Sequence, residues 1–347
     1  MRLSTIVDYS LDPRTIADAV AALERAGVDI VWVPEVYTFD APSLLGYLAA
    51  RTTTIQLGSG ILPIYSRTPT LLAMTAAGID ALSDGRCILG LGASGPQVIE
   101  GWHGVAYDRP IVRTREIIDI CRQVWERSAP LVHHGAAYQI PLPPERGTGL
   151  GKPLRIINRP RRPRIPIWLA ALGERNVTLA AELAEGWLPV FFIPERASEV
   201  FGPSLAAGLS RRDPSLDPLE IAAGGPLAIT EDPEEASRLR DLARPHTALY
   251  VGGMGARGKN FYNALVCRYG WEAEAATIQD HYLSGRKAEA EAAVPDALLE
   301  QTSLIGPESY VKERIDAYRE AGVTVLNVVS VGPNGARDIS RVKHHVS

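Results

Sequence analysis

The sequence predicts an α/β protein folded as a (β/α)₈ barrel, with all 347 residues in a single domain. Three observations lead to this prediction. Short apolar segments alternate with amphipathic helical segments, with a repeat of about 30 residues. The apolar segments are almost uninterrupted by polar residues, which is typical of parallel strands buried on both faces. Eight such units occur along the chain, and this number favours a closed barrel over an open doubly wound sheet.

The units can be assigned in order along the chain. The first helix has the clearest boundaries, because Asp12 is suited to the N-cap, Pro13 to the first turn and Gly27 to the C-terminal stop. The predicted strands are Leu3–Tyr9, Asp29–Pro34, Ile55–Leu62, Arg86–Gly92, Ile165–Ala171, Gly186–Phe192, Glu220–Ile229 and Val323–Val331. The predicted helices include Pro13–Ala26, Pro42–Ala50, Thr70–Leu82, Glu174–Ala184 and Pro307–Ala321.

Two segments do not follow the repeat and are predicted to be insertions. The first, at about 131–165, is rich in Pro, Gly and Arg and is too long for an ordinary connection, so we expect a functional insertion at one mouth of the barrel. The second, at about 232–300, is rich in alanine and is predicted to be mostly helical, with an interruption at Val251–Gly255.

Composition limits the function classes. The net charge is −4 with acidic and basic residues interspersed, which argues against a nucleic-acid partner. Cys87, Cys121 and Cys267 are widely spaced and form no CxxC pair, as expected in a reducing cytoplasm. The N-terminus has no signal-peptide pattern, and no apolar stretch is long enough to cross a bilayer. We therefore expect a soluble cytoplasmic protein without a membrane partner.

The segment Arg86–Gly104 (RCILGLGASGPQVIEGWHG) is the strongest functional candidate. A buried strand ends in glycines, Ala93-Ser94-Gly95 offers bare backbone N–H groups, and Pro96 suits the first turn of a helix. Such a strand-to-helix turn can bind a phosphate group. The residues also match G-x-G-x-x-G, but three units precede them and no acidic residue ends the next strand, so a dinucleotide site is a weaker interpretation. A simple tight turn is the other alternative, and it is favoured over the dinucleotide site.

Other candidates lie at the ends of predicted strands, where barrel enzymes bind their ligands. Glu35 is a candidate hydrogen-bond acceptor or acid/base, or else a member of a salt bridge or a helix cap. The glycines of Gly58-Ser59-Gly60 either let a flat ring approach the backbone or allow close packing. Arg175, in the turn Leu172–Asn176, is either an anion ligand or a surface residue, and His103 is either an active-site acid or a structural loop residue.

Several alternative chemistries lack their motifs. The sequence contains no HExxH, no G-x-S-x-G and no GxxxxGK[ST]. The pairs His133-His134 and His344-His345 lack a third ligand at suitable spacing, so no metal is predicted. An organic cofactor that carries the chemistry is the better explanation.

Long ordered blocks resemble the bacterial luciferase-like flavin superfamily, and in particular its branch that uses the deazaflavin coenzyme F420. They include IQLGSGILPIYSRTPTLLAMTAAGIDALSDGRCILGLGASGPQVIEGWHG and IPIWLAALGERNVTLAAELAEGWLPVFF, and the resemblance covers about 3–192 and 302–331. It implies a barrel that holds the deazaflavin at its C-terminal mouth, a non-proline cis peptide at Gly60–Ile61, and often a homodimer. The cofactor-binding positions that it implies are Glu35, Gly60, Ile61, Ala93, Ser94, Gly95, Val98, Leu172, Gly173, Arg175 and Asn176.

The sequence also departs from the sugar-phosphate dehydrogenases of this family. They carry a histidine after the acidic residue and a glutamate in the phosphate turn, where this chain has Val36 and Gly95. The resemblance therefore argues against glucose 6-phosphate oxidation. The remaining candidates to deliver a proton near the expected ring position are Glu35, Tyr37, Tyr65 and His103.

These observations predict an F420-dependent oxidoreductase that transfers a hydride between the deazaflavin and a small organic substrate. We expect reduction of an activated C=C, C=N or C=O bond, with Glu35, Tyr65 and His103 as the candidate catalytic residues. Two alternatives stay open, namely an FMN-dependent monooxygenase on the same barrel and a cofactor-binding protein without catalysis.

Overall fold

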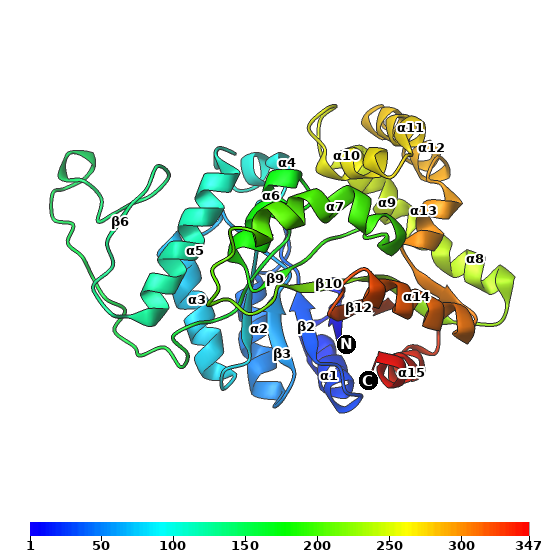
Figure 1. Cartoon of the computed structure of the whole chain (residues 1–347), viewed down its shortest axis with the longest axis horizontal. Coiled ribbons are helices and arrows are strands. Elements are labelled where there is room, and N and C mark those ends of the chain that lie inside the picture. The colour runs from blue at the N-terminus through cyan, green and yellow to red at the C-terminus, as the bar shows by residue number, and fades with distance from the viewer. Residues whose placement is uncertain (347) are drawn as a thin grey trace.

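Eight parallel strands close into a barrel in the computed structural model, which describes residues 1–346. Each barrel strand pairs with the next along the chain, and the last pairs with the first, as Figure 1 shows in outline. The predicted barrel is confirmed. Its strands are β1 (Arg2–Ile6), β2 (Ile30–Val33), β3 (Gln56–Ser59), β5 (Cys87–Gly92), β8 (Ile167–Leu169), β9 (Gly186–Trp187), β10 (Glu220–Ile229) and β12 (Val325–Ser330).

Helices cover the outside of the barrel. The first helix begins as predicted, with the Asp12 side chain accepting a hydrogen bond from the Arg14 N–H and Gly27 in the left-handed region at its C-terminal end. The helices that follow the barrel strands or complete the layer are α1 (Pro13–Arg25), α2 (Ala41–Arg51), α3 (Pro69–Leu82), α4 (Pro96–Gly101), α5 (Pro110–Glu126), α6 (Glu174–Leu183), α7 (Pro194–Leu209), α14 (Glu308–Glu320) and α15 (Gly335–Val346).

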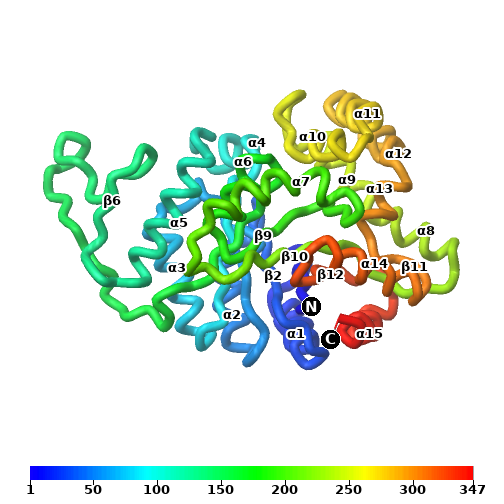
Figure 2. The backbone as a smooth tube through the Cα atoms, viewed as in Figure 1, coloured from blue at the N-terminus to red at the C-terminus, as the bar shows by residue number. Residues whose placement is uncertain are grey.

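The two ends of the described chain lie side by side (Figure 2). The amino group of Met1 donates a hydrogen bond of 2.8 Å to the carbonyl oxygen of Val346, and β1 pairs with β12 next to it. The ring of strands is therefore closed by contacts between segments that are more than 300 residues apart in sequence.

The barrel interior is filled by two tryptophan rings. Trp32 and Trp168 lie inside it with ring centroids 5.3 Å apart, and both side chains are buried. They fit because the neighbouring strands carry glycine: a Cβ at Gly58 would lie 2.3 Å from the Trp32 ring, and one at Gly186 would lie 2.0 Å from the Trp168 ring. Of the two interpretations of Gly58, close packing is the one that the structure supports.

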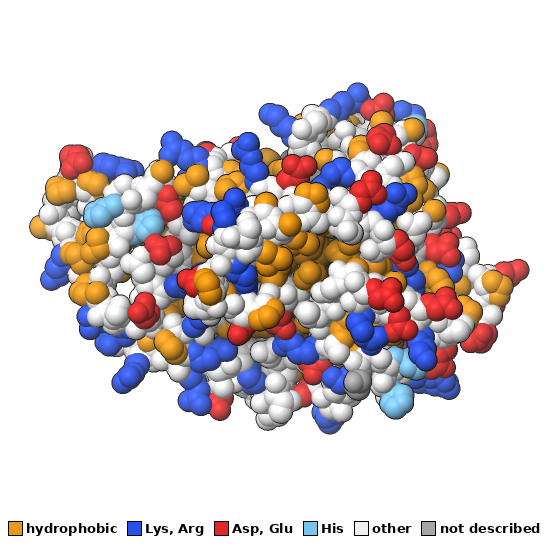
Figure 3. All heavy atoms as spheres, in the orientation of Figure 1, with side chains coloured by type: hydrophobic (Ala, Val, Ile, Leu, Met, Phe, Trp, Pro, Cys, Tyr) orange, Lys and Arg blue, Asp and Glu red, His pale blue; other side chains and the backbone are white. Residues whose placement is uncertain are grey.

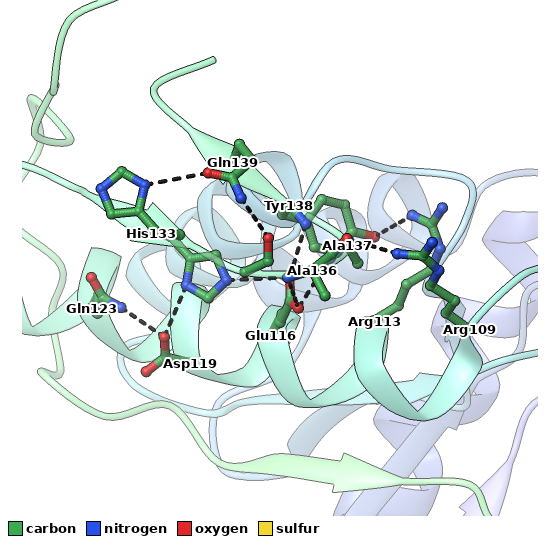
Figure 4. Close-up of polar contacts among 12 residues, drawn as sticks. Arg109, Arg113, Glu116, Asp119, Gln123, His133, Ala136, Ala137, Tyr138 and Gln139 are labelled. Atoms are coloured by element: carbon green, nitrogen blue, oxygen red, sulfur yellow. Dashed lines mark hydrogen bonds and ion pairs between the residues drawn. The ribbon is translucent and has the colours of Figure 1, made fainter. Parts of the chain in front are cut away.

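The first insertion is an arm between α5 and β8, comprising β6 (His133–His134), β7 (Gln139–Ile140) and η1 (Pro144–Arg146). It projects from the body in Figure 1 and exposes Leu150 and Ile157, and Figure 3 shows hydrophobic and basic side chains next to one another on it. We expected this segment at a mouth of the barrel. Instead, its hairpin packs on the outer face of α5, because that helix carries the side chains that bind the hairpin backbone (Figure 4).

Glu116 of α5 anchors this hairpin (Figure 4). Its carboxylate accepts hydrogen bonds from the backbone N–H groups of Ala136, Ala137 and Tyr138 at 2.7–3.1 Å and lies 3.3 Å from Nε2 of His133. Burial alone would raise the pKa of Glu116. The hydrogen bonds from the backbone and from His133 lower it by more than burial raises it, so the pKa of Glu116 lies below its ordinary value. The ionised carboxylate therefore holds the arm on α5.

Exchange of Glu116 for glutamine is expected to speed hydrogen exchange at the Ala136–Tyr138 amides about tenfold at neutral pH, since charge-assisted hydrogen bonds are lost. In the parent protein the anchor is complete above pH about 4.5 and is lost as the pH falls through the lowered pKa. The variant lacks this acid step. Exposed Glu126→Gln on the same helix is the control, and equal exchange in both variants would contradict the anchoring role.

The second insertion is helical, as expected, and lies between β10 and the short strand β11 (Leu304–Gly306). It consists of α8 (Pro233–Asp241), α9 (Arg244–Ala248), a π-helical turn at Leu249–Gly253, α10 (Phe261–Arg268), α11 (Glu272–Leu283), α12 (Lys287–Ala292) and α13 (Asp296–Gln301). The predicted interruption coincides with the π turn and the loop that follows it. None of the helices within residues 1–346 is long and apolar enough to cross a membrane.

Candidate active site

The candidate residues follow the C-terminal ends of four strands, so the barrel brings them to one end. Figure 1 shows α4 and α10 at this end. A Cβ at Gly95 would lie 3.8 Å from the Met254 carbonyl oxygen, and one at Gly173 would lie 3.8 Å from the Phe261 ring. The loop and helix of the second insertion therefore cover both predicted cofactor turns.

Two of these turns lead into helices without a side-chain cap. Helices α1, α2 and α3 each have an N-cap side chain that accepts a backbone N–H. In contrast, α4 and α6 begin at Gly95 and Gly173, which provide no such group. Within the described chain, the first-turn N–H groups of Gln97, Glu174 and Arg175 have no protein acceptor, and the missing Cβ atoms leave room for an anion to approach them.

The remaining residues of the two turns surround these glycines. Ser94 has a φ of +57°, which is uncommon for a residue with a side chain, and it turns the chain between β5 and α4. Ala93 and Leu172 pack against the core, Val98 is buried, and the Asn176 N–H donates to the Gly173 carbonyl.

Arg175 occupies a different environment from the other turn residues. Its exposed side chain lines a groove of about 670 Å³ between α5, α6 and α7 on the outside of the barrel. Arg115, Arg211 and Arg268 line the same groove, and Arg115 and Arg211 share the carboxylate of Glu182. The structure therefore places Arg175 beside the uncapped start of α6, but on the outer side of it.

The peptide bond between Gly60 and Ile61 is cis, as the family resemblance implies. It lies between β3 and the short β4 (Leu62–Pro63), where the pairing with β5 is interrupted. The Ser59 hydroxyl bridges this interruption by bonding to both the N–H and the carbonyl of Gly90, at 2.9 and 2.8 Å. The side chain of Ser59 thus replaces a missing rung of the ladder.

Glu35 is engaged by two protein partners. Arg67 Nη1 and Nη2 lie 2.5 and 2.9 Å from its two carboxylate oxygens, and the Ala41 N–H at the start of α2 donates to it at 2.9 Å. The side chains of Glu35 and Arg67 are only 7% and 13% exposed. The arrangement realises both the salt-bridge and the helix-cap interpretations of Glu35. The sequence gives no signal for the pairing of Arg67 with Glu35, although Arg67 follows β4 in the same ring of loops.

Tyr65 and His103 have contrasting surroundings. The Tyr65 hydroxyl donates to the Asp108 carbonyl oxygen at 2.8 Å, and burial together with Tyr107 raises its pKa above the ordinary value, so it stays protonated. Nε2 of His103 is buried and has no hydrogen-bond partner within the described chain. The Glu35 carboxylate and the Tyr65 hydroxyl are hydrogen-bonded to protein groups. Among the three candidate catalytic residues, only His103 has a buried polar side-chain atom without such a partner within the described chain.

Metal-dependent chemistry would need a cluster of ligating side chains at suitable spacing. Within residues 1–346, no group of three or more His, Cys, Asp or Glu side chains is arranged to hold a metal ion.

Comparisons with known proteins agree over nearly the whole chain. The family model described as luciferase-like monooxygenase matches residues 2–325. A Mycobacterium tuberculosis protein named as a coenzyme F420-dependent oxidoreductase is 40% identical over 94% of each chain. A 5,10-methylenetetrahydromethanopterin reductase of Archaeoglobus fulgidus is 29% identical over 93% of this chain and 92% of its own.

A solved structure shows the same fold. The coenzyme F420-dependent tetrahydromethanopterin reductase of Methanopyrus kandleri superposes with a TM-score of 0.78 at 24% identity, covering 99% of this chain and 98% of that one.

Proposed function

The chain belongs to the luciferase-like monooxygenase family, and on this basis we propose that it is a coenzyme F420-dependent oxidoreductase. We infer that it reduces an activated C=C, C=N or C=O bond of a small organic substrate. The relatives named above support the cofactor and the reductive direction. The observation that carries the proposal is the pair of uncapped glycine turns at Gly95 and Gly173, at the same end of the barrel.

The residues that would hold the cofactor fall into two groups. The free N–H groups of Gln97, Glu174 and Arg175, with the Ser94 hydroxyl, would bind the phosphate, whereas the Arg175 side chain lies on the outer side of α6. Gly60 and Ile61 would support a face of the ring. When bound, the deazaflavin supplies a hydride at its C5. The protein's own contribution is to position substrate and ring and to exclude water.

We assign different roles to the three candidate catalytic residues. Glu35, held by Arg67 and Ala41, would order the loop beside the ring. Tyr65 would position the segment at Asp108. His103, with its unpartnered Nε2, is the best candidate to deliver a proton. Once a substrate is found, His103→Gln should lower turnover and leave the affinity for F420 unchanged, and an unaltered turnover would refute this assignment.

Titration of the purified protein with oxidised coenzyme F420, and separately with FMN, tests the cofactor. Binding is measured by the fluorescence of the cofactor and of tryptophan. We expect micromolar or tighter binding of the deazaflavin and at least tenfold weaker binding of FMN. A preference for FMN would favour oxygen chemistry instead, and binding of neither would remove the basis for the glycine turns as a cofactor site.

Exchange of Gly95 or Gly173 for alanine is expected to weaken F420 binding about tenfold while the melting temperature stays within about 2 °C. Both residues have negative φ values, and the added methyl groups would meet protein atoms no closer than 3.4 Å, so the fold tolerates them. The methyl group would instead occupy the position that a phosphate oxygen approaches. Unchanged F420 affinity in both variants would contradict the assignment.

A homodimer is also proposed, as the family resemblance implies. The outer face of α2 and α3 exposes the large apolar residues Tyr47, Leu71, Met74 and Leu82, which a second copy of the chain would cover. Sedimentation equilibrium of the parent and of Met74→Glu tests this, with a monomeric parent as the contradicting result.

A further inference from the structure

The groove between α5, α6 and α7, on the outside of the barrel, begins at the turn that starts α6. Residues 174, 175, 178, 179 and 182 of α6 line it, and their spacing places them on one face over about 12 Å of the helix axis. The apolar part of the lining comes from all three helices and consists of Ile111, Leu179, Val200, Pro203 and Ala207. The groove, of about 670 Å³, therefore runs from the turn after Gly173 outward along α6 and α7.

Two arginines of this groove have no carboxylate partner within the described chain. The Arg268 guanidinium donates hydrogen bonds to the carbonyl oxygens of Leu172 and Val200, at 2.8 and 3.2 Å, and these neutral groups leave its charge uncompensated. The exposed side chain of Arg175 has neither a hydrogen bond nor an ion pair among residues 1–346. Arg268 holds the turn at Leu172 in place, whereas the Arg175 side chain holds nothing.

The other two arginines of the groove share one carboxylate. Arg115 of α5 and Arg211, which follows α7, lie 2.7 and 3.3 Å from the Glu182 carboxylate of α6. The hydrogen bond from Arg115, together with the charges of both arginines, holds the pKa of Glu182 below its ordinary value, so this carboxylate is ionised at neutral pH. One negative charge thus faces two positive charges, and one of these stays uncompensated.

The groove as a whole carries a surplus of positive charge. Four arginines and three glutamates line it, and the lining residue Glu199 is already paired with Arg196, which lies outside the lining. The remaining acid, Glu174, is exposed at the first position of α6, where the helix dipole favours a carboxylate. A groove with apolar walls and surplus positive charge attracts a flexible anionic chain.

We propose that this groove binds the oligocarboxylate end of the cofactor, the chain of γ-linked glutamates that follows the phosphate of coenzyme F420. The inference rests on the proposed function and adds to the cofactor site a second binding region, outside the barrel. The free N–H groups of Glu174 and Arg175 lie where the groove begins, so a chain attached to a phosphate at this turn starts beside the Arg175 side chain. A groove with a purely structural role would need the arginines that link the helices through Glu182, but not Arg175.

Two forms of the cofactor that differ only in this chain test the proposal: F420 with several glutamates, and the form that ends at the phospholactate without any glutamate. Their binding to the full-length protein is measured by deazaflavin fluorescence at low ionic strength. We expect the form with glutamates to bind at least about tenfold more tightly, because the tethered carboxylates reach the arginines at a high effective concentration. The difference should fall below about threefold in about 0.5 M sodium chloride, which screens exposed charges. Equal affinities at low ionic strength would overturn the proposal.

Arginine variants then locate the chain. Arg175→Gln and Arg211→Gln each remove one positive charge from the groove, and we expect each to lower the ratio of the two affinities about threefold. Arg14→Gln is the matched control, since Arg14 is the exposed second residue of α1 as Arg175 is the exposed second residue of α6. The control should leave the ratio unaltered. The same ratio in all three variants would show that the chain binds elsewhere.

The same titrations separate this proposal from the proposed function. Binding of the form without glutamates, with no gain in affinity from the chain, refutes the role of the groove and leaves the cofactor assignment standing. Absence of binding by both forms refutes the cofactor assignment, and the role of the groove with it.

Discussion

Replacement of Arg67 by methionine is expected to lower the free energy of unfolding by about 3–5 kcal/mol, because a buried carboxylate then loses its partner. Glu35 is 7% exposed and receives two hydrogen bonds from the Arg67 guanidinium. Without them, only the Ala41 N–H remains bonded to that carboxylate among the contacts of the described chain. Urea unfolding followed by tryptophan fluorescence measures the change.

The double variant Glu35→Gln/Arg67→Met is the matched control. Removal of both charges avoids an unpaired buried ion, so we expect it to recover at least half of the lost stability. A loss below about 1 kcal/mol in Arg67→Met would show that the pair contributes no more than a surface salt bridge. That result would return Glu35 to consideration as a residue free to act on a ligand.

Exchange of Gly90 for alanine is expected to destabilise the barrel by about 4 kcal/mol or more, since the added methyl group has no room. Its Cβ would lie 1.8 Å from the backbone oxygen of Ser59 in the neighbouring strand. A backbone atom in a barrel strand cannot rotate away as a side chain can. The strands β3 and β5 would have to separate, and the Ser59 hydroxyl would lose its bonds to Gly90.

Gly78→Ala provides the opposite control. Gly78 lies in α3, and a Cβ added there would have no neighbouring atom within 4 Å, so alanine should stabilise the protein by about 0.5–1 kcal/mol. Thermal and urea unfolding of both variants measures the difference. If Gly90→Ala unfolds within about 1 kcal/mol of the parent, the packing argument fails. The expected result would also explain the first glycine of the G-x-G-x-x-G match by strand packing instead of dinucleotide binding.

Much of the fold could be predicted because each barrel unit carries its own local signals. The run from Cys87 to Gly92 is apolar and ends in glycine, and Asp12, Pro13 and Gly27 mark the ends of the first helix, as the structure confirms. The path of the first insertion could not be predicted. It depends on Glu116, which lies about 20 residues before the hairpin that it binds.

In the candidate site, too, some features could be predicted from the sequence and others could not. The turn at Ala93–Gly95 is recognisable because strand, glycine and helix follow one another directly in sequence. The pairing of Glu35 with Arg67 is not recognisable, because the two residues lie in loops after different strands, 32 positions apart.

By itself, the sequence determined the strand and helix units and the two glycine turns, because their signals lie between near neighbours in the chain. The number of units predicted the barrel, and the resemblance of long blocks indicated the family. Only the tertiary structure decided which side chains are already committed to protein partners and which remain available to a ligand. That decision rests on contacts between distant segments: Arg67 on Glu35, Ser59 on Gly90, and the insertion over Gly95 and Gly173. Local sequence patterns do not predict such contacts, because the burial of these side chains and the pairing between distant residues are set only when the barrel closes.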